Sequence, residues 1–317
     1  LMFQTWLNNP PVDAVIEVAQ DYVTAIAGAM KNGGLTVHSC VSERLPVDLI
    51  NPSINEKSFR DRNAVSQIFE RVCKGLPFKP KRVGLVVPDG IAKVSLLRFE
   101  QTPRRHSDLE KLIRWQMKRV VPFPIEEARL TYTPGRNIGI NGQEFLVVAA
   151  KHEIVDQYES LCAAIEAYAG LVNLATLSLL NFYLIPGQQT SGDWILVNTQ
   201  VGSTSIAVVR DDKVIFYRNN VDNEVLTITN LVHQTVMYYQ DHLSGQGFCK
   251  GLIRGTPKVA QSIQESLKAL INCPVELIEP EGVSSVLSIT STSKIDMHSI
   301  IISAGLLAQH SYSERPN

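Results

Sequence analysis

The chain has 317 residues, enough for two domains of ordinary size that each have a core. Hydrophobic residues make up 44% and charged residues 19%, a balance typical of globular proteins rather than of disordered chains. The formal net charge of -1 disfavours a nucleic-acid-binding protein and a strongly electrostatic membrane anchor. No apolar run approaches the roughly 20 residues of a membrane-spanning helix, so we expect no direct membrane insertion. Five scattered cysteines without metal-ligand spacing indicate reduced thiols, a cytoplasmic protein and no metal site.

The first part of the chain predicts three consecutive antiparallel strands, a helix and a further strand. The turn Asp89-Gly90 follows that strand, so we expect residues 93–99 to pair back with it as a hairpin. Ser107, with Glu110 at the capping-box position, predicts the start of another helix. We expect strands at 12–16, 22–30, 35–41, 82–87, 93–99, 130–133, 145–150 and near 171, and helices at 56–74, 107–121, 153–168 and 176–183.

Residues 186–192 are the best linker candidate, and beyond them the first pattern repeats. Strands are expected at 194–198, 203–210, 214–218, 252–253 and 275–278, and helices at 225–242, 259–271 and 298–308. The order of three strands, helix, strand and helix thus occurs twice, and it resembles the ribonuclease-H-like unit shared by actin and sugar kinases. The sequence therefore predicts an α/β fold with two actin-like lobes. We place the first lobe at 1–186, with an inserted α+β subdomain at about 82–172, and the second at 187–317, with helix 298–308 packing back toward the first.

The most distinctive stretch is an amphipathic helix from Leu109 that runs into Val121-Pro122-Phe123-Pro124 and two glutamates. Strands follow, the second ending in Val-Val-Ala-Ala-Lys at Lys151. This stretch resembles the signature of the type IV pilus assembly protein PilM family, whose inserted subdomain has a helix leading into the same proline-rich turn. Arg218, Thr227 and the closing residues 304–308 also match, so the resemblance spans nearly the whole chain.

In the PilM family, a groove between the inserted subdomain and the first lobe receives the cytoplasmic N-terminal peptide of the membrane protein PilN. The resemblance implies a cytoplasmic adaptor, peripheral to the inner membrane, in the assembly platform of a type IV pilus or a related type II secretion system. Its expected partner is a PilN-like protein, with the pilus assembly ATPase as a further candidate and no nucleic acid. Because aromatic and arginine side chains dominate interface hot spots, we select Arg114 and Trp115, with Val121 and Phe123 of the turn, as partner-contact residues. A core role is the alternative for Trp115 and Phe123.

The nucleotide-binding turns of the family are eroded in this chain. Actin-type ATPases need glycine and small hydroxyl residues there, because backbone N–H groups must approach the phosphates closely. PilM proteins read Ile-Asp-Ile-Gly-Ser-Ser-Ser-Val at the first turn, where this chain has Glu17 for the aspartate, Ala19 for the glycine and Gln20 for a serine. Asp21 also places a negative charge where phosphate would lie, a repulsion of about 4 kcal/mol at about 4 Å and an effective dielectric of about 20.

The second turn and the adenosine motif are eroded as well. Asn198 replaces the aspartate and Gln200 replaces the glycine of the family motif. Thr204 is retained, and the nearest glycine, Gly202, lies two positions after the place where the family has its glycine. The Leu-x-Gly-Gly-Gly adenosine motif is reduced to Ile-Arg-Gly-Thr at 253–256, so only Gly255 and Thr256 remain as candidates. The sequence therefore predicts a pseudo-ATPase that needs no cofactor. ATP or ADP with Mg²⁺, Glu17 acting as a longer metal-binding carboxylate, is the alternative.

Two other classes of function remain as competing hypotheses. An actin-fold ATPase or kinase would need the glycine-rich phosphate turns that this chain lacks. A polymer-forming protein related to FtsA would gain from a C-terminal amphipathic membrane helix, and none is visible after Ala308. We therefore expect an interaction protein rather than an enzyme.

Overall fold

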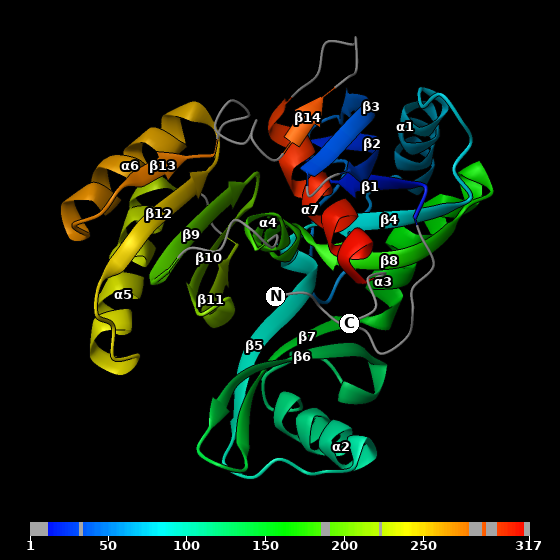
Figure 1. Cartoon of the computed structure of the whole chain (residues 1–317). Coiled ribbons are helices and arrows are strands. Elements are labelled where there is room, and N and C mark those ends of the chain that lie inside the picture. The colour runs from blue at the N-terminus through cyan, green and yellow to red at the C-terminus, as the bar shows by residue number, and fades with distance from the viewer. Residues whose placement is uncertain are drawn as a thin grey trace.

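The computed structural model describes residues 12–31, 34–184, 191–221, 224–278, 287–289 and 297–313. Three sheets of six, five and three strands organise these residues. Figure 1 shows two α/β lobes side by side and the smaller three-stranded sheet below them. Residues 186–190 of the expected linker lie outside the described residues.

The first lobe is built on the six-stranded sheet, with strand order β14-β3-β2-β1-β4-β8. Its elements are β1 (Ala14–Val18), β2 (Tyr22–Lys31), β3 (Gly34–Arg44), α1 (Arg62–Lys74), β4 (Arg82–Val87), the 3₁₀ turns η1 (Asp89–Ile91) and η3 (Ser160–Ile165), α3 (His152–Glu159), β8 (Tyr168–Leu174), α4 (Ala175–Tyr183), β14 (Leu287–Ile289) and α7 (Met297–Ser313). All five residues of β1 are buried, as expected for a central strand between two helical layers. The Asp61 carboxylate caps α1 by accepting hydrogen bonds from two backbone N–H groups of its first turn.

The second lobe repeats this architecture, with strand order β11-β10-β9-β12-β13. Its elements are β9 (Asp193–Gln200), β10 (Ser203–Arg210), β11 (Lys213–Asn220), α5 (Val225–His242), β12 (Phe248–Arg254), α6 (Pro257–Leu270) and β13 (Val275–Leu277). The first strand of each lobe pairs antiparallel with the second and parallel with the fourth. The duplicated α/β fold predicted from the sequence is therefore confirmed.

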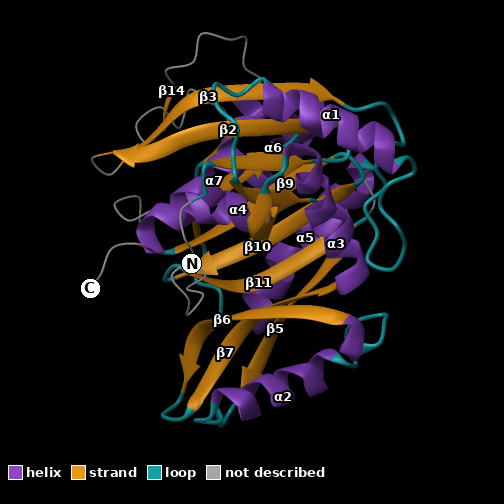
Figure 2. Ribbon diagram, turned by 90° about the vertical axis from the view of Figure 1, so that its right-hand side faces the viewer, coloured by secondary structure: helices purple, strands orange, loops and turns teal. Residues whose placement is uncertain are grey.

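The inserted subdomain is a three-stranded antiparallel sheet with one long helix. It comprises β5 (Ala92–Phe99), α2 (His106–Met117), the 3₁₀ turn η2 (Ile125–Glu127), β6 (Ala128–Ile138) and β7 (Gly142–Lys151), in the order β5-β7-β6. Figure 2 shows α2 on the side of this sheet that faces away from the lobes. Leu109, Ile113 and Met117 are spaced one helical turn apart and form the face of α2 that packs against the sheet. These contacts give the subdomain a hydrophobic core of its own.

Three local predictions were wrong. Residues 93–99 pair with β7 and not with β4, because an apolar strand pattern does not name its partner. The subdomain is narrower than 82–172, since β4 and β8 belong to the six-stranded sheet and only residues 92–151 form the separate unit. Helix α2 has Arg105 as its N-cap with no side-chain capping bond, so the expected capping box of Ser107 and Glu110 is not formed.

The last described segments of the chain belong to the first lobe. Helix α7 packs against α4 and against β1, β2, β3 and β4, and β14 pairs in parallel with β3. The helices α4 and α7 touch at Gly305, where an added β-carbon would lie 1.8 Å from the Ser178 carbonyl oxygen. A glycine at this point is what lets the two backbones approach so closely.

Candidate functional site

A chain of buried polar side chains joins the two lobes at the ends of β1, β9 and β12. The Tyr22 hydroxyl donates to Glu17 Oε1 at 2.7 Å and accepts from Arg254 Nη2 at 3.2 Å. Arg254 Nη1 also donates to Asn198 Oδ1 at 3.3 Å. Arg254, from the second lobe, therefore reaches a tyrosine of the first lobe while it holds the residue at the end of β9.

The same chain continues to the turn after β4 and the start of α4. Asn198 Nδ2 donates to Thr176 Oγ1 at 2.8 Å, and the Thr176 backbone N–H and hydroxyl both donate to Asp89. From the second lobe, Ser205 Oγ donates to Asp89 Oδ2 at 2.8 Å. We call these residues the interlobe cluster: Glu17, Tyr22, Asp89, Thr176, Asn198, Ser205 and Arg254. Three of its hydrogen bonds cross between the lobes, namely Arg254 to Tyr22, Asn198 to Thr176 and Ser205 to Asp89.

Burial sets the charges of this cluster. Removal from water raises the pKa of Glu17 to about 7, although the nearby Arg254 charge and the Tyr22 hydroxyl oppose the rise. Burial likewise raises the pKa of Asp89, against hydrogen bonds from Thr176 and Ser205. Arginine stays charged at any physiological pH. The cluster thus contains one permanent cation beside two carboxyl groups whose pKa values are raised by burial and held down in part by that cation.

The two predicted phosphate turns contact each other. A β-carbon on Gly202, whose φ is +77°, would lie 2.3 Å from Gln20 Oε1. The Gln20 side chain therefore occupies the space between the β1–β2 turn and the β9–β10 turn. In the part of the chain that the structure describes, no group of three or more His, Cys, Asp or Glu side chains is placed to hold a metal ion.

The nine residues selected for the nucleotide site lie at or near the ends of strands in the two lobe sheets. They occupy the ends of β1 and β9, the turns that follow, the start of β10 and the junction of β12 with α6: Glu17, Ala19, Gln20, Asn198, Gln200, Gly202, Thr204, Gly255 and Thr256. Tyr22, Asp89, Thr176, Ser205 and Arg254 were not predicted as site residues from the sequence. A charged residue that ends an apolar strand is the signal that would have identified Arg254.

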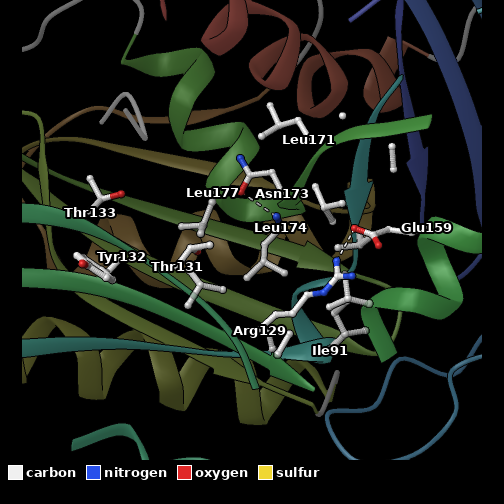
Figure 3. A pocket seen from close by; sticks show the side chains of 18 of the residues that line it. Ile91, Arg129, Thr131, Tyr132, Thr133, Glu159, Leu171, Asn173, Leu174 and Leu177 are labelled. Atoms are coloured by element: carbon white, nitrogen blue, oxygen red, sulfur yellow. Dashed lines mark hydrogen bonds and ion pairs between the residues drawn. The ribbon is translucent and has the colours of Figure 1, made fainter. Parts of the chain in front are cut away.

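A separate groove lies between the inserted sheet and the first lobe (Figure 3). Its cavity volume is about 390 Å³. Ile91, Leu171, Leu174 and Leu177 from the first lobe form an apolar wall, and β6 and β7 face it from the insert. Among the described residues, β8 and β6 are the outermost strands of their sheets, so each presents a strand edge near the groove.

The rim of the groove is polar. Arg129 on β6 donates to Glu159 Oε1 at 2.5 Å and to Asp156 Oδ1 at 2.8 Å, which ties the inserted sheet to the end of α3. Thr131 and Thr133 follow at alternate positions along β6 and line the same space. The arrangement combines an apolar wall with a few oriented polar groups, as binding sites for peptides and small molecules do.

The four residues selected for partner contact do not line this groove. Trp115 is 53% exposed on the outer face of α2, where the Arg119 guanidinium lies 4.8 Å from its ring centroid. Arg114 donates to Glu110 and to the Ile125 carbonyl oxygen. Val121 is buried and Phe123 is partly buried in the core of the subdomain. Helix α2 packs on the far side of the inserted sheet, whereas the groove is formed by β6, β7 and β8. The selection of these four residues for partner contact therefore stays a prediction separate from this groove.

Within the described residues, no helix has the length and apolar character to cross a membrane.

Comparison with known proteins gives both a family and a fold. The sequence profile of the family described as Type IV pilus assembly protein PilM matches residues 16–232. A solved structure of a PilM–PilN type IV pilus biogenesis complex superposes with a TM-score of 0.77 at 13% identity, covering 97% of this chain and 100% of that chain. A Bacteroides thetaiotaomicron protein with an actin-like ATPase fold gives a TM-score of 0.50 at 10% identity, covering 84% of this chain and 91% of the other.

The cytoplasmic domain of EpsL, an inner-membrane component of the type II secretion system of Vibrio cholerae, gives a TM-score of 0.49 at 10% identity, with 96% of each chain covered. No curated protein matches the sequence. The family profile covers well over half of the chain, and the matching structures share its two-lobe architecture. The chain therefore belongs to the type IV pilus assembly protein PilM family and has an actin-like fold.

Proposed function

We propose that this protein is a cytoplasmic adaptor, peripheral to the inner membrane, in the assembly platform of a type IV pilus or a related type II secretion system. In this role it holds the N-terminal peptide of a PilN-like membrane protein in the groove between β6 and β8. The groove is the observation that carries the proposal. A PilM structure solved with PilN shares the fold over nearly the whole chain, which supports the same class of partner.

The groove suits an extended peptide. Its volume of about 390 Å³ holds several side chains, within the range of ordinary ligand pockets. Backbone groups at the edge of β8 or β6 can pair with a peptide strand, and alternate side chains of that strand can enter the apolar wall. Thr131, Arg129 and Glu159 on the rim are positioned to bond the polar positions of the peptide.

The contacts of the interlobe cluster and of the two phosphate turns support an adaptor rather than an ATPase. Gln20 fills the space between the two phosphate turns, and the Arg254 guanidinium lies beside Glu17, the residue that stands where the family has its metal-binding aspartate. Glu17 Oε1 already accepts a hydrogen bond from Tyr22, and the permanent charge of nearby Arg254 repels a divalent cation, so this is a poor site for Mg²⁺. In the proposed function the protein binds its partner without nucleotide. Neither an ATPase activity nor a polymer-forming role is needed to explain the groove.

Calorimetric titration tests the proposal with one peptide and two matched variants. The peptide is the cytoplasmic N-terminal segment of the PilN-like protein of the same organism. Thr131→Arg places a long charged side chain in the groove from an exposed position, and we expect at least about tenfold weaker binding, or about 1.4 kcal/mol. Asn137→Arg adds the same side chain farther along β6, outside the groove, and should bind like the wild type.

A parallel titration with Mg-ATP separates the competing functions. Peptide binding without nucleotide binding supports the adaptor. Tight Mg-ATP binding with turnover would instead return Glu17, Asn198 and Thr204 to an active nucleotide site. Equal peptide affinity for the wild type and both variants would remove the groove as the binding surface.

A further inference from the structure

Arg254 is the one arginine of the interlobe cluster, and it is only 8% exposed. A guanidinium cannot lose its charge in such a site, so burial is tolerated only where hydrogen bonds and nearby negative charge compensate for the loss of water. Tyr22 and Asn198 accept hydrogen bonds from its two terminal nitrogens, and Glu17 lies behind Tyr22. The side chain therefore connects the start of β2 in the first lobe with the end of β9 in the second.

We infer that Arg254 is a built-in cation that ties the two lobes together without a bound ligand, and that it thereby keeps the groove between β6 and β8 in its peptide-binding shape. The second half of this inference rests on the proposed function, whereas the first half does not. Arg254 acts here as a positioning residue, because it belongs to the interlobe cluster and does not line the groove.

The path from Arg254 to the groove is short. Asn198, held by Arg254, donates to Thr176, and Thr176 donates to Asp89. Leu174 and Leu177 lie on either side of Thr176 in the chain and line the groove. The apolar wall of the groove and the polar contacts between the lobes are therefore made by the same backbone segments, η1 and the start of α4.

The second lobe also contacts the insert directly. Strand β11 lies against β5, β6 and η1, and β10 lies against η1. Ser205 on β10 donates to Asp89 at the centre of this contact, and Tyr217 and Asn219 on β11 donate to Ser205 at 3.1 and 2.9 Å. A shift of the second lobe would therefore move β11 against the inserted sheet and change the width of the groove.

Substitution of Arg254 in the full chain tests the inference by peptide affinity. We expect Arg254→Ala to bind the peptide at least about tenfold more weakly and Arg254→Lys to fall between it and the wild type, since one ammonium cannot reproduce a planar two-nitrogen fork. Methylguanidinium added to Arg254→Ala should recover part of the affinity, an effect that general damage to the fold would not show. Arg60→Ala, at an exposed position of the first lobe, is the matched control and should bind like the wild type.

Solution scattering tests the lobe contact independently of any peptide. Arg254→Ala should have a larger radius of gyration than the wild type, and Arg60→Ala should not. If the wild type binds no peptide, the proposed function fails and the scattering result alone decides the inference. If the wild type binds, unchanged affinity and unchanged radius of gyration in Arg254→Ala overturn the inference.

Ser205→Ala keeps the inference testable if Arg254→Ala does not fold. It cuts the bond from the second lobe to Asp89 and changes no charge. We expect several-fold weaker peptide binding and a partial increase in the radius of gyration, with Ser107→Ala on the exposed start of α2 as control. Wild-type behaviour of Ser205→Ala in both measurements would show that the interlobe cluster does not shape the groove.

Discussion

Glu17 should make the free energy of unfolding depend on pH, and its replacement by glutamine should remove that dependence. Burial raises the pKa of Glu17 from 4.5 to about 7, and the charge of nearby Asp21 adds to the rise. The Arg254 charge and hydrogen bonds from Tyr22 and Ser303 oppose it. The unfolded chain has none of these contacts, so the carboxyl returns to its ordinary pKa. At about 1.36 kcal/mol per pKa unit, the difference corresponds to about 3 kcal/mol.

The sign of the effect follows from which state holds the proton. Below pH 4.5 the Glu17 carboxyl is protonated in both states and does not change stability. Between 4.5 and about 7 the unfolded chain releases its proton first, so the free energy of unfolding falls as pH rises. Above about pH 7 both states are ionised and the loss is complete. Glu17→Gln carries a neutral amide throughout and lacks this fall.

Equilibrium unfolding in urea measures the effect at a series of pH values. Between about pH 5 and about pH 8, the free energy of unfolding of Glu17→Gln should rise relative to that of the wild type by about 2.5 kcal/mol. Glu265→Gln, at an exposed position on α6, corrects for the loss of a surface carboxylate. Parallel curves for the wild type and Glu17→Gln, or a relative change of opposite sign, would refute the argument that burial dominates the charge state of Glu17.

Two further substitutions test the packing described above. Gly305→Ala should lower the free energy of unfolding by about 3 kcal/mol or more, because the new methyl group meets the Ser178 carbonyl and forces α4 and α7 apart. Gly90→Ala, whose β-carbon has no neighbour closer than 3.5 Å, is its control, and equal stability of the two variants would contradict the close contact. Trp115→Ala should change stability by less than about 0.5 kcal/mol and leave peptide affinity unchanged, because its ring lies exposed on the outer face of α2. A marked loss of affinity in this variant would move the binding surface from the groove to α2.

The repeated element order was predictable from the sequence because it depends on local patterns. The alternation of strand and helix signals places helix 225–242 within its observed bounds, and the apolar runs of β1 and β4 mark the interior of a sheet. The family resemblance rested on the stretch from Leu109 to Lys151, whose proline-rich turn has a distinctive sequence.

Strand partners and groove residues were not predictable in the same way. The run 93–99 reads as a strand whichever neighbour it has, and only the folded chain shows that it pairs with β7. Trp115 looked like an interface residue by its type, but the choice between the two sides of the inserted sheet depends on how α2 packs. Strand β14 spans three residues, too short for a periodic signal.

Arg254 shows a different limit of sequence reasoning. Within the eroded adenosine motif it stands at the variable position, where the residue type carries no family signal. Its partners Tyr22 and Asn198 lie 232 and 56 residues away in the chain, so no local window contains the hydrogen bonds that give the residue its place. The groups that stabilise a buried charge are its neighbours in the folded structure, and a single sequence does not show which residues these are.

The position of α7 and β14 in the first lobe has a consequence for the order in which the protein can fold during synthesis. The second lobe is continuous from β9 to β13, so all of its strands are synthesised before α7. The first lobe must wait, because Leu306 and Leu307 of α7 cover Gly84 and Gly28 on its sheet. Until then the nascent chain carries an uncovered apolar sheet surface, and closing it requires contacts between residues more than 200 positions apart, a slow step for any chain. A released chain that ended before α7 would therefore have a complete second lobe joined to a first lobe that is open to aggregation and to chaperones.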